Sequence, residues 1–142
     1  MTRFALVHGG LAAILLLLTC GTGVPAEPFP FDQELLLDAA PMRPGKRMPV
    51  LAVEPNGNGR IDLWCRTVLA RVEISDATIK IEPGPLPEGL PEMMSAGQCT
   101  PERMQADDEL LGALIQVIDW RLQGDGIVLE GPKILRFRPS DH

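Results

Sequence analysis

The chain has 142 residues, a formal net charge of −6 and 23% charged residues. This length suits one domain with one hydrophobic core. The acidic balance argues against nucleic acid and against an anionic membrane surface as partners, because both favour lysine and arginine.

Residues 1–26 predict a secretory signal peptide. Arg3 is the only charged residue before Glu27, an apolar block follows at 11–18, and small residues lead to Ala26. A positive start, an apolar middle and a small-residue exit are the parts of a cleaved leader. A membrane-spanning helix needs about 20 apolar residues, more than this block has. We therefore expect export and no membrane span.

Two processing sites compete within this leader. Val24 and Ala26 are small residues at the positions before a cut after residue 26, which would give a periplasmic or secreted protein. Alternatively, Cys20 becomes the new N-terminus and carries a lipid that anchors the protein to a membrane. Thr19 fits lipoprotein processing less well, so we favour the cut after Ala26 and keep Cys20 as the candidate lipidation site.

A proline-rich stretch at 27–47 follows the leader. Its prolines prevent a long regular element, so we expect an extended lead-in packed on the domain, with a short helical turn within 32–40. The folded domain is expected at 48–139.

Alternating apolar and polar residues predict antiparallel strands after residue 48. A first strand at 48–54 ends at the turn sequence PNGNG. Alternation continues through 60–65, 68–74 and 78–82, which places one set of side chains inward. The region is thus predicted to be a meander with one buried face.

The sequence PGPLPEGLPE at 83–92 predicts a stiff loop. Four prolines in ten residues exclude a central strand. We interpret the loop first as a spacer. The alternative is a rigid contact surface formed by Pro85, Leu86, Pro87 and Leu90, because a stiff loop loses little entropy on binding.

One helix is predicted at about 107–118. Its apolar side consists of Leu110, Leu111, Leu114, Val117 and Ile118. Extending the helix back through Met104 would place Asp107 within that apolar side, so we expect Asp107 to be the N-cap. The acids Asp107, Asp108 and Glu109 also allow an acid/base or metal site, but stabilisation of a helix start explains them better.

Strands return at the end of the chain. Short runs at 120–122, 127–129 and 134–138, of which the first and last alternate, are separated by glycine-containing turns. Arg136 and Arg138 point outward in this pattern. They allow anion binding, although a solvated strand face is the simpler interpretation.

Cleavage after Ala26 leaves two of the three cysteines, Cys65 and Cys99. An even pair in an oxidising compartment predicts a disulfide. It would close a loop of about 35 residues and contribute ~3–4 kcal/mol. Two buried free thiols are the alternative, and a metal site fits less well because the spacing is not C-x-x-C.

Groups for catalysis are scarce. The processed chain has one histidine, His142, at its very end, and the sequence has no tyrosine. A nucleophile and base pair would need a histidine held by the fold. We therefore expect a protein that is not an enzyme and binds no cofactor or metal.

The order of these motifs resembles the META domain (HslJ-like) family of bacterial envelope proteins. The matching pieces are GRIDLWC (59–65), VLARVEISDATIKI (68–81), AGQCTPERM (96–104), DDELLGALIQVIDW (107–120) and RLQGDGIVLEGPKILRFRP (121–139). The chain departs from the family where Arg66 replaces the asparagine after the first cysteine. The resemblance implies an α+β fold in which a curved antiparallel sheet of about six to eight short strands packs around one main helix.

The resemblance also implies an envelope role linked to stress tolerance, without known catalytic residues. We therefore expect a monomeric accessory domain that binds an envelope protein or a small ligand. A secreted inhibitor of a hydrolase, acting through the 83–92 loop, is the alternative.

Overall fold

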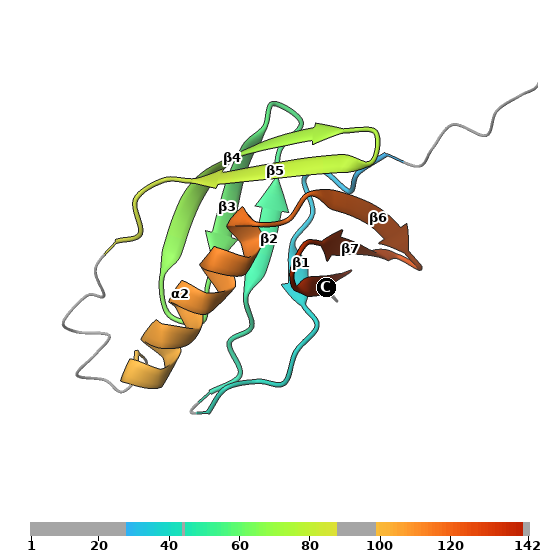
Figure 1. Cartoon of the computed structure of the whole chain (residues 1–142). Coiled ribbons are helices and arrows are strands. Elements are labelled where there is room, and N and C mark those ends of the chain that lie inside the picture. Colours follow the sequence, from blue (N-terminus) through green and yellow to red (C-terminus); the bar gives the residue numbers. More distant parts are fainter. Residues whose placement is uncertain (1–27, 44, 88–98, 141–142) are drawn as a thin grey trace, which may run out of the picture.

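The computed structural model describes residues 28–43, 45–87 and 99–140. Within these ranges the chain forms eight strands and one helix (Figure 1). The strands are β1 (Leu35–Leu37), β2 (Val50–Val53), β3 (Asn58–Asp62), β4 (Thr67–Ser75), β5 (Thr78–Pro83), β6 (Asp119–Gln123), β7 (Gly126–Glu130) and β8 (Ile134–Pro139), and the helix is α2 (Pro101–Ile115). The expected α+β class with an antiparallel sheet and one main helix is confirmed.

The sheet closes into a barrel whose strands follow chain order. Each strand pairs antiparallel with the next, and β1 pairs with β8 to complete the ring. The seam between β5 and β6 is thin, because its register pairs only Thr78 with Asp119. Helix α2 connects these two strands and packs against β5 (Figure 1). The helix thus packs against one of the two strands that form this thin seam.

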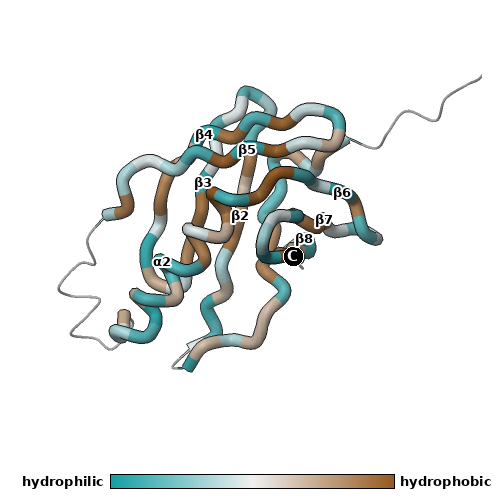
Figure 2. Tube along the Cα trace, viewed as in Figure 1, coloured by the Kyte–Doolittle hydropathy of each residue, from teal (hydrophilic) through white to brown (hydrophobic). Residues whose placement is uncertain are grey.

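The core lies inside the barrel and under the helix. Val68 and Val72 of β4 and Ile79 and Ile81 of β5 are buried, as their alternation predicted. Apolar and polar residues alternate along these two strands in Figure 2. The helix adds Leu110, Leu111 and Leu114 to the same cluster. Each fully buried side chain of this size stabilises the fold by about 1.5–3 kcal/mol.

The segment before residue 48 contributes a strand, and the helical turn expected within 32–40 is wrong. This strand, β1, lies between β2 and β8. Its Leu35 and Leu37 side chains are buried, and Leu36 between them is only partly buried. Phe29 also enters the core, where its ring meets that of Trp120 at a centroid distance of 5.2 Å. An extended β1 forms backbone hydrogen bonds with the edges of both β2 and β8. A single helical turn would leave those backbone groups without these partners, so the strand is favoured over the turn.

The helix starts earlier and ends earlier than the span 107–118 predicted from the sequence. Thr100 is the N-cap, and its hydroxyl accepts the backbone N–H of Arg103 at 3.3 Å. Pro101 takes the first helical position, where a missing N–H costs nothing. Since the helix ends at Ile115, Ile118 falls outside it and is exposed rather than buried. Asp107 is therefore inside the helix and is not its N-cap.

Candidate functional site

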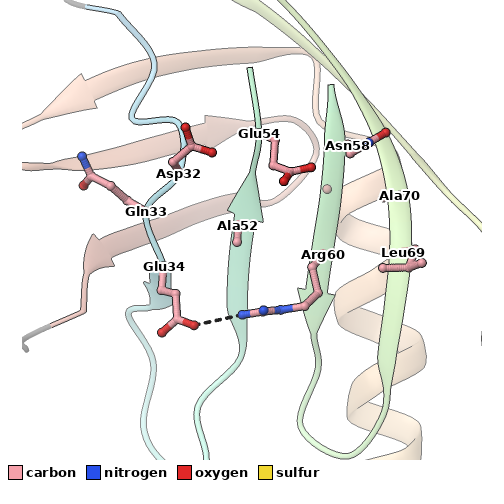
Figure 3. A pocket seen from close by; sticks show the side chains of 10 residues that line it. Asp32, Gln33, Glu34, Ala52, Glu54, Asn58, Arg60, Leu69 and Ala70 are labelled. Carbon is pink, nitrogen blue, oxygen red and sulfur yellow. Dashed lines mark hydrogen bonds and ion pairs between the residues drawn. The ribbon is translucent and has the colours of Figure 1, made fainter. Parts of the chain in front are cut away.

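An open hollow of about 630 Å³ lies on the outer face of β1–β4 (Figure 3). The polar side chains around it come from the turn before β1, from the residue after β2 and from β3, and Leu69 of β4 stands at one side. The residues that matter for its chemistry are Asp32, Glu34, Ala52, Glu54, Asn58, Arg60 and Leu69.

Strand register explains the shape of this hollow. Arg60 pairs with Ala52 on one side and with Leu69 on the other. The methyl group of Ala52 is short, so the Arg60 guanidinium reaches over β2 to the Glu34 carboxylate at 3.0 Å (Figure 3). A larger side chain in place of Ala52 would fill the space that this ion pair spans.

Arg60 is held between two acids. Its Nε lies 3.2 Å from Asp62, in addition to the contact with Glu34. Arg60 is substantially exposed, so each of these ion pairs contributes at most about 1 kcal/mol. The positive charge of Arg60 is nevertheless compensated locally, and the hollow presents more carboxylate than cation.

The lining of the hollow combines carboxylates with one exposed apolar side chain. The carboxylates of Asp32 and Glu54 line the hollow, and Leu69, which is 70% exposed, lies at the edge of the hollow (Figure 3). Carboxylates attract cationic groups, and an exposed leucine offers apolar contact. The surface therefore suits a partner that combines positive charge with an apolar part.

The two cysteines lie together, as predicted. Cys65 follows β3 and Cys99 directly precedes the N-cap of α2, and their Cα atoms are 5.3 Å apart, which is disulfide distance. Both side chains are only 2% exposed. The Met104 sulfur lies 3.4 Å from the Cys65 sulfur. This pair attaches the start of the helix to the barrel.

Asp107 is the polar centre of the same region, which corrects its assignment to helix-start chemistry. The side chain is 0% exposed, and its oxygens accept the backbone N–H of Cys65 at 3.0 Å and that of Arg66 at 2.9 Å. The Arg66 Nε also donates to the Asp107 carboxylate at 3.1 Å, and the Arg66 Nη2 contacts the exposed Asp108 at 3.0 Å. Asp107 is thus a buried acceptor that fixes the loop between β3 and β4 to the helix.

The proposed contact loop is only partly described. Leu86 is half-buried and packs against the core, while Pro85 and Pro87 are exposed. Leu90 lies outside the described residues, as do Cys20 and the predicted signal peptide. The packing of Leu86 makes it part of the domain rather than a projecting contact.

Sequence patterns did not reveal the hollow or the role of Asp107. Glu34 and Arg60 are 26 positions apart, so only the strand register could have brought them together. For Asp107 the useful signal was the sequence Thr100-Pro101-Glu102, a helix start that places residue 107 in the helix interior.

The fold and site define a small antiparallel barrel with one covering helix, a cysteine pair at disulfide distance and an open polar hollow. No protein-family model matches the chain, and the comparisons with curated proteins and with solved structures found no match either. The resemblance to the META domain family therefore stays a prediction.

Two further findings concern the part of the chain that the structure describes. None of its helices is long and apolar enough to cross a membrane. Across residues 28–43, 45–87 and 99–140, no group of three or more histidine, cysteine, aspartate or glutamate side chains could hold a metal ion.

Proposed function

We propose that the chain is an exported META-like domain of the cell envelope that works by binding rather than by catalysis. Its signal peptide directs it across the membrane, and the folded barrel acts as an accessory module for an envelope protein or a small ligand. The observation that carries this proposal is the buried Cys65–Cys99 pair at disulfide distance. Such pairs persist as disulfides in oxidising compartments and are rare in the cytosol.

The hollow on β1–β4 supports the binding part of this proposal. Its lining combines the carboxylates of Asp32, Glu54 and the Arg60-paired Glu34 with the exposed Leu69 side chain. The hollow lies on rigid strands of the barrel. A preformed surface on strands loses little freedom when a partner docks. We therefore assign partner contact to this face in preference to the 83–92 loop, whose Leu86 packs on the core.

The export half is tested by expressing the full chain with a C-terminal tag in a bacterium and measuring the intact mass of the protein in each cell fraction. We expect an envelope product that begins at Glu27 and has no free thiol. A product with a lipid on Cys20 would place the domain at a membrane surface instead. An intact chain with free thiols in the cytoplasm would contradict export.

The binding half is tested by affinity capture from envelope extract with two matched variants. Leu69→Arg places a cation at the edge of the hollow, and Ile134→Arg makes the same change at an exposed residue of β8, outside the hollow. We expect the first variant to lose the captured partner and the second to keep it. Equal capture by both variants would contradict binding at the hollow.

A further inference from the structure

Three sulfur atoms meet where α2 begins. Cys65 comes from the loop after β3, Cys99 directly precedes the N-cap of the helix, and Met104 lies in the first turn of the helix. The Met104 Sδ is 3.4 Å from the Cys65 Sγ, and the cysteine Cα atoms are 5.3 Å apart. The third member is a thioether, so this group is distinct from the histidine, cysteine and carboxylate clusters that hold most protein metals.

A polar frame fixes these residues independently of the sulfur atoms. Asp107 accepts the backbone N–H of Cys65 at 3.0 Å, and the Arg66 Nη2 donates to the backbone oxygen of Met104 at 3.0 Å. Arg66 and Asp107 are themselves joined at 3.1 Å. None of these contacts uses a sulfur atom, so we expect them to hold Cys65 and Met104 when the bond between the cysteines is opened.

We propose that the reduced form of this protein binds one Cu(I) ion through the Cys65 and Cys99 thiolates and the Met104 thioether. Thiolate and thioether ligands are soft and select Cu(I), whereas structural Zn²⁺ takes four nitrogen or sulfur ligands. The two histidines of the chain, His8 and His142, lie outside the described residues. The nearby carboxylate, Asp107, is occupied by backbone N–H groups and Arg66.

The reaction balances in two steps. A dithiol reductant transfers two electrons and two protons to the Cys65–Cys99 disulfide, which becomes two thiols while the reductant becomes a disulfide. Cu(I) then forms a bond to each cysteine sulfur, and the two thiol protons are released to solvent. Met104 adds its sulfur lone pair, so no further proton or electron moves.

The geometry and charge of the site fit this ligand set. With metal–sulfur bonds of about 2.3 Å, the ligands of a trigonal centre lie roughly 4 Å apart. The Met104 sulfur is already near that separation from the Cys65 sulfur, whereas the two cysteine sulfur atoms have to move apart to reach it after reduction. Cys99 adjoins the N-terminus of a helix of 15 residues, whose positive end stabilises a thiolate.

The test is a competition titration with Cu(I) held by a chromophoric bicinchoninate chelator. The full chain carrying Cys20→Ser, so that the third cysteine adds no ligand, is reduced with a phosphine and desalted without oxygen. We expect it to take up one Cu(I) per chain with a new near-ultraviolet sulfur-to-copper absorption band, and we expect the oxidised chain to take up none. Circular dichroism should show that the reduced chain keeps its fold.

Met104→Leu is the decisive variant because it removes only the thioether. We expect it to bind Cu(I) at least about tenfold more weakly, a difference of about 1.4 kcal/mol. Met48→Leu makes the same change in another half-buried methionine and should bind as the parent does. Loss of the fold on reduction, no uptake by the reduced chain, or unchanged affinity in Met104→Leu would each overturn the proposal.

Discussion

The strongest test of this structure is the replacement of Asp107 by alanine. The change removes an acceptor that is 0% exposed and holds three donors, which are the backbone N–H groups of Cys65 and Arg66 and the Arg66 guanidinium. A buried donor left without a partner costs about 1–3 kcal/mol. Breaking a buried ion pair from one side costs about 3–5 kcal/mol. Since these costs overlap, we expect Asp107→Ala to lower the free energy of unfolding by about 3–5 kcal/mol.

Urea unfolding followed by tryptophan fluorescence measures this loss, with the cysteine pair left oxidised in every sample. Asp108→Ala is the matched control, because Asp108 is the next residue, contacts the same guanidinium at 3.0 Å and is 66% exposed. An exposed ion pair of this kind contributes at most about 1 kcal/mol. Asp107→Asn keeps the size of the side chain and should fall between the two. Equal losses for Asp107→Ala and Asp108→Ala would refute the role assigned to Asp107.

Three further predictions use urea unfolding followed by tryptophan fluorescence, with the parent protein oxidised. Replacing Cys65 and Cys99 together by serine should cost about 3–4 kcal/mol for a closed loop of this length, and a loss near zero would show that the pair is not bonded in the protein. Gly126→Ala should destabilise by about 1–3 kcal/mol, because its Cβ would collide with a backbone oxygen of β8, whereas Gly112→Ala meets no atom within 4 Å. The latter change should stabilise the helix by about 0.5–1 kcal/mol, so the same sign for both would contradict the packing. Leu35→Ala should cost about 2–5 kcal/mol, and a loss below about 1 kcal/mol would show that β1 is not part of the core.

The strands from β2 to β5 were predictable because the information is local. Alternation within each run sets its inward face, and the short turns between runs fix which strands are neighbours. The inward positions of β4 and β5 followed from the sequence for that reason. The three leucines of β1 carry no such pattern, and their conformation is decided by strand edges of β2 and β8 that lie far away in sequence.

The site was less predictable because its partners are distant. Asp107 was placed outside the helix on the rule that a charge avoids an apolar side. That rule fails here because backbone donors 42 and 41 residues earlier reach the carboxylate and satisfy it. The pairing of Cys65 with Cys99 needed only a count of cysteines. The hollow needed the register of four strands, which no short sequence motif contains.

Closure of the ring through β1 and β8 has a consequence for the order of folding. All other strand neighbours are consecutive in sequence, so each pair can form once its own connection is available; this connection contains helix α2 for β5 and β6. The closing contact between β1 and β8 pairs Leu35 with Pro139, and the Ser140 backbone N–H donates to the Glu34 backbone oxygen at 2.9 Å. A chain emerging from a ribosome can therefore complete the barrel only when residues 134–140 are out. Until then, the outer edges of β1 and β7 lack the strand that covers them in the closed ring, so they are open to strands of other chains and favour aggregation.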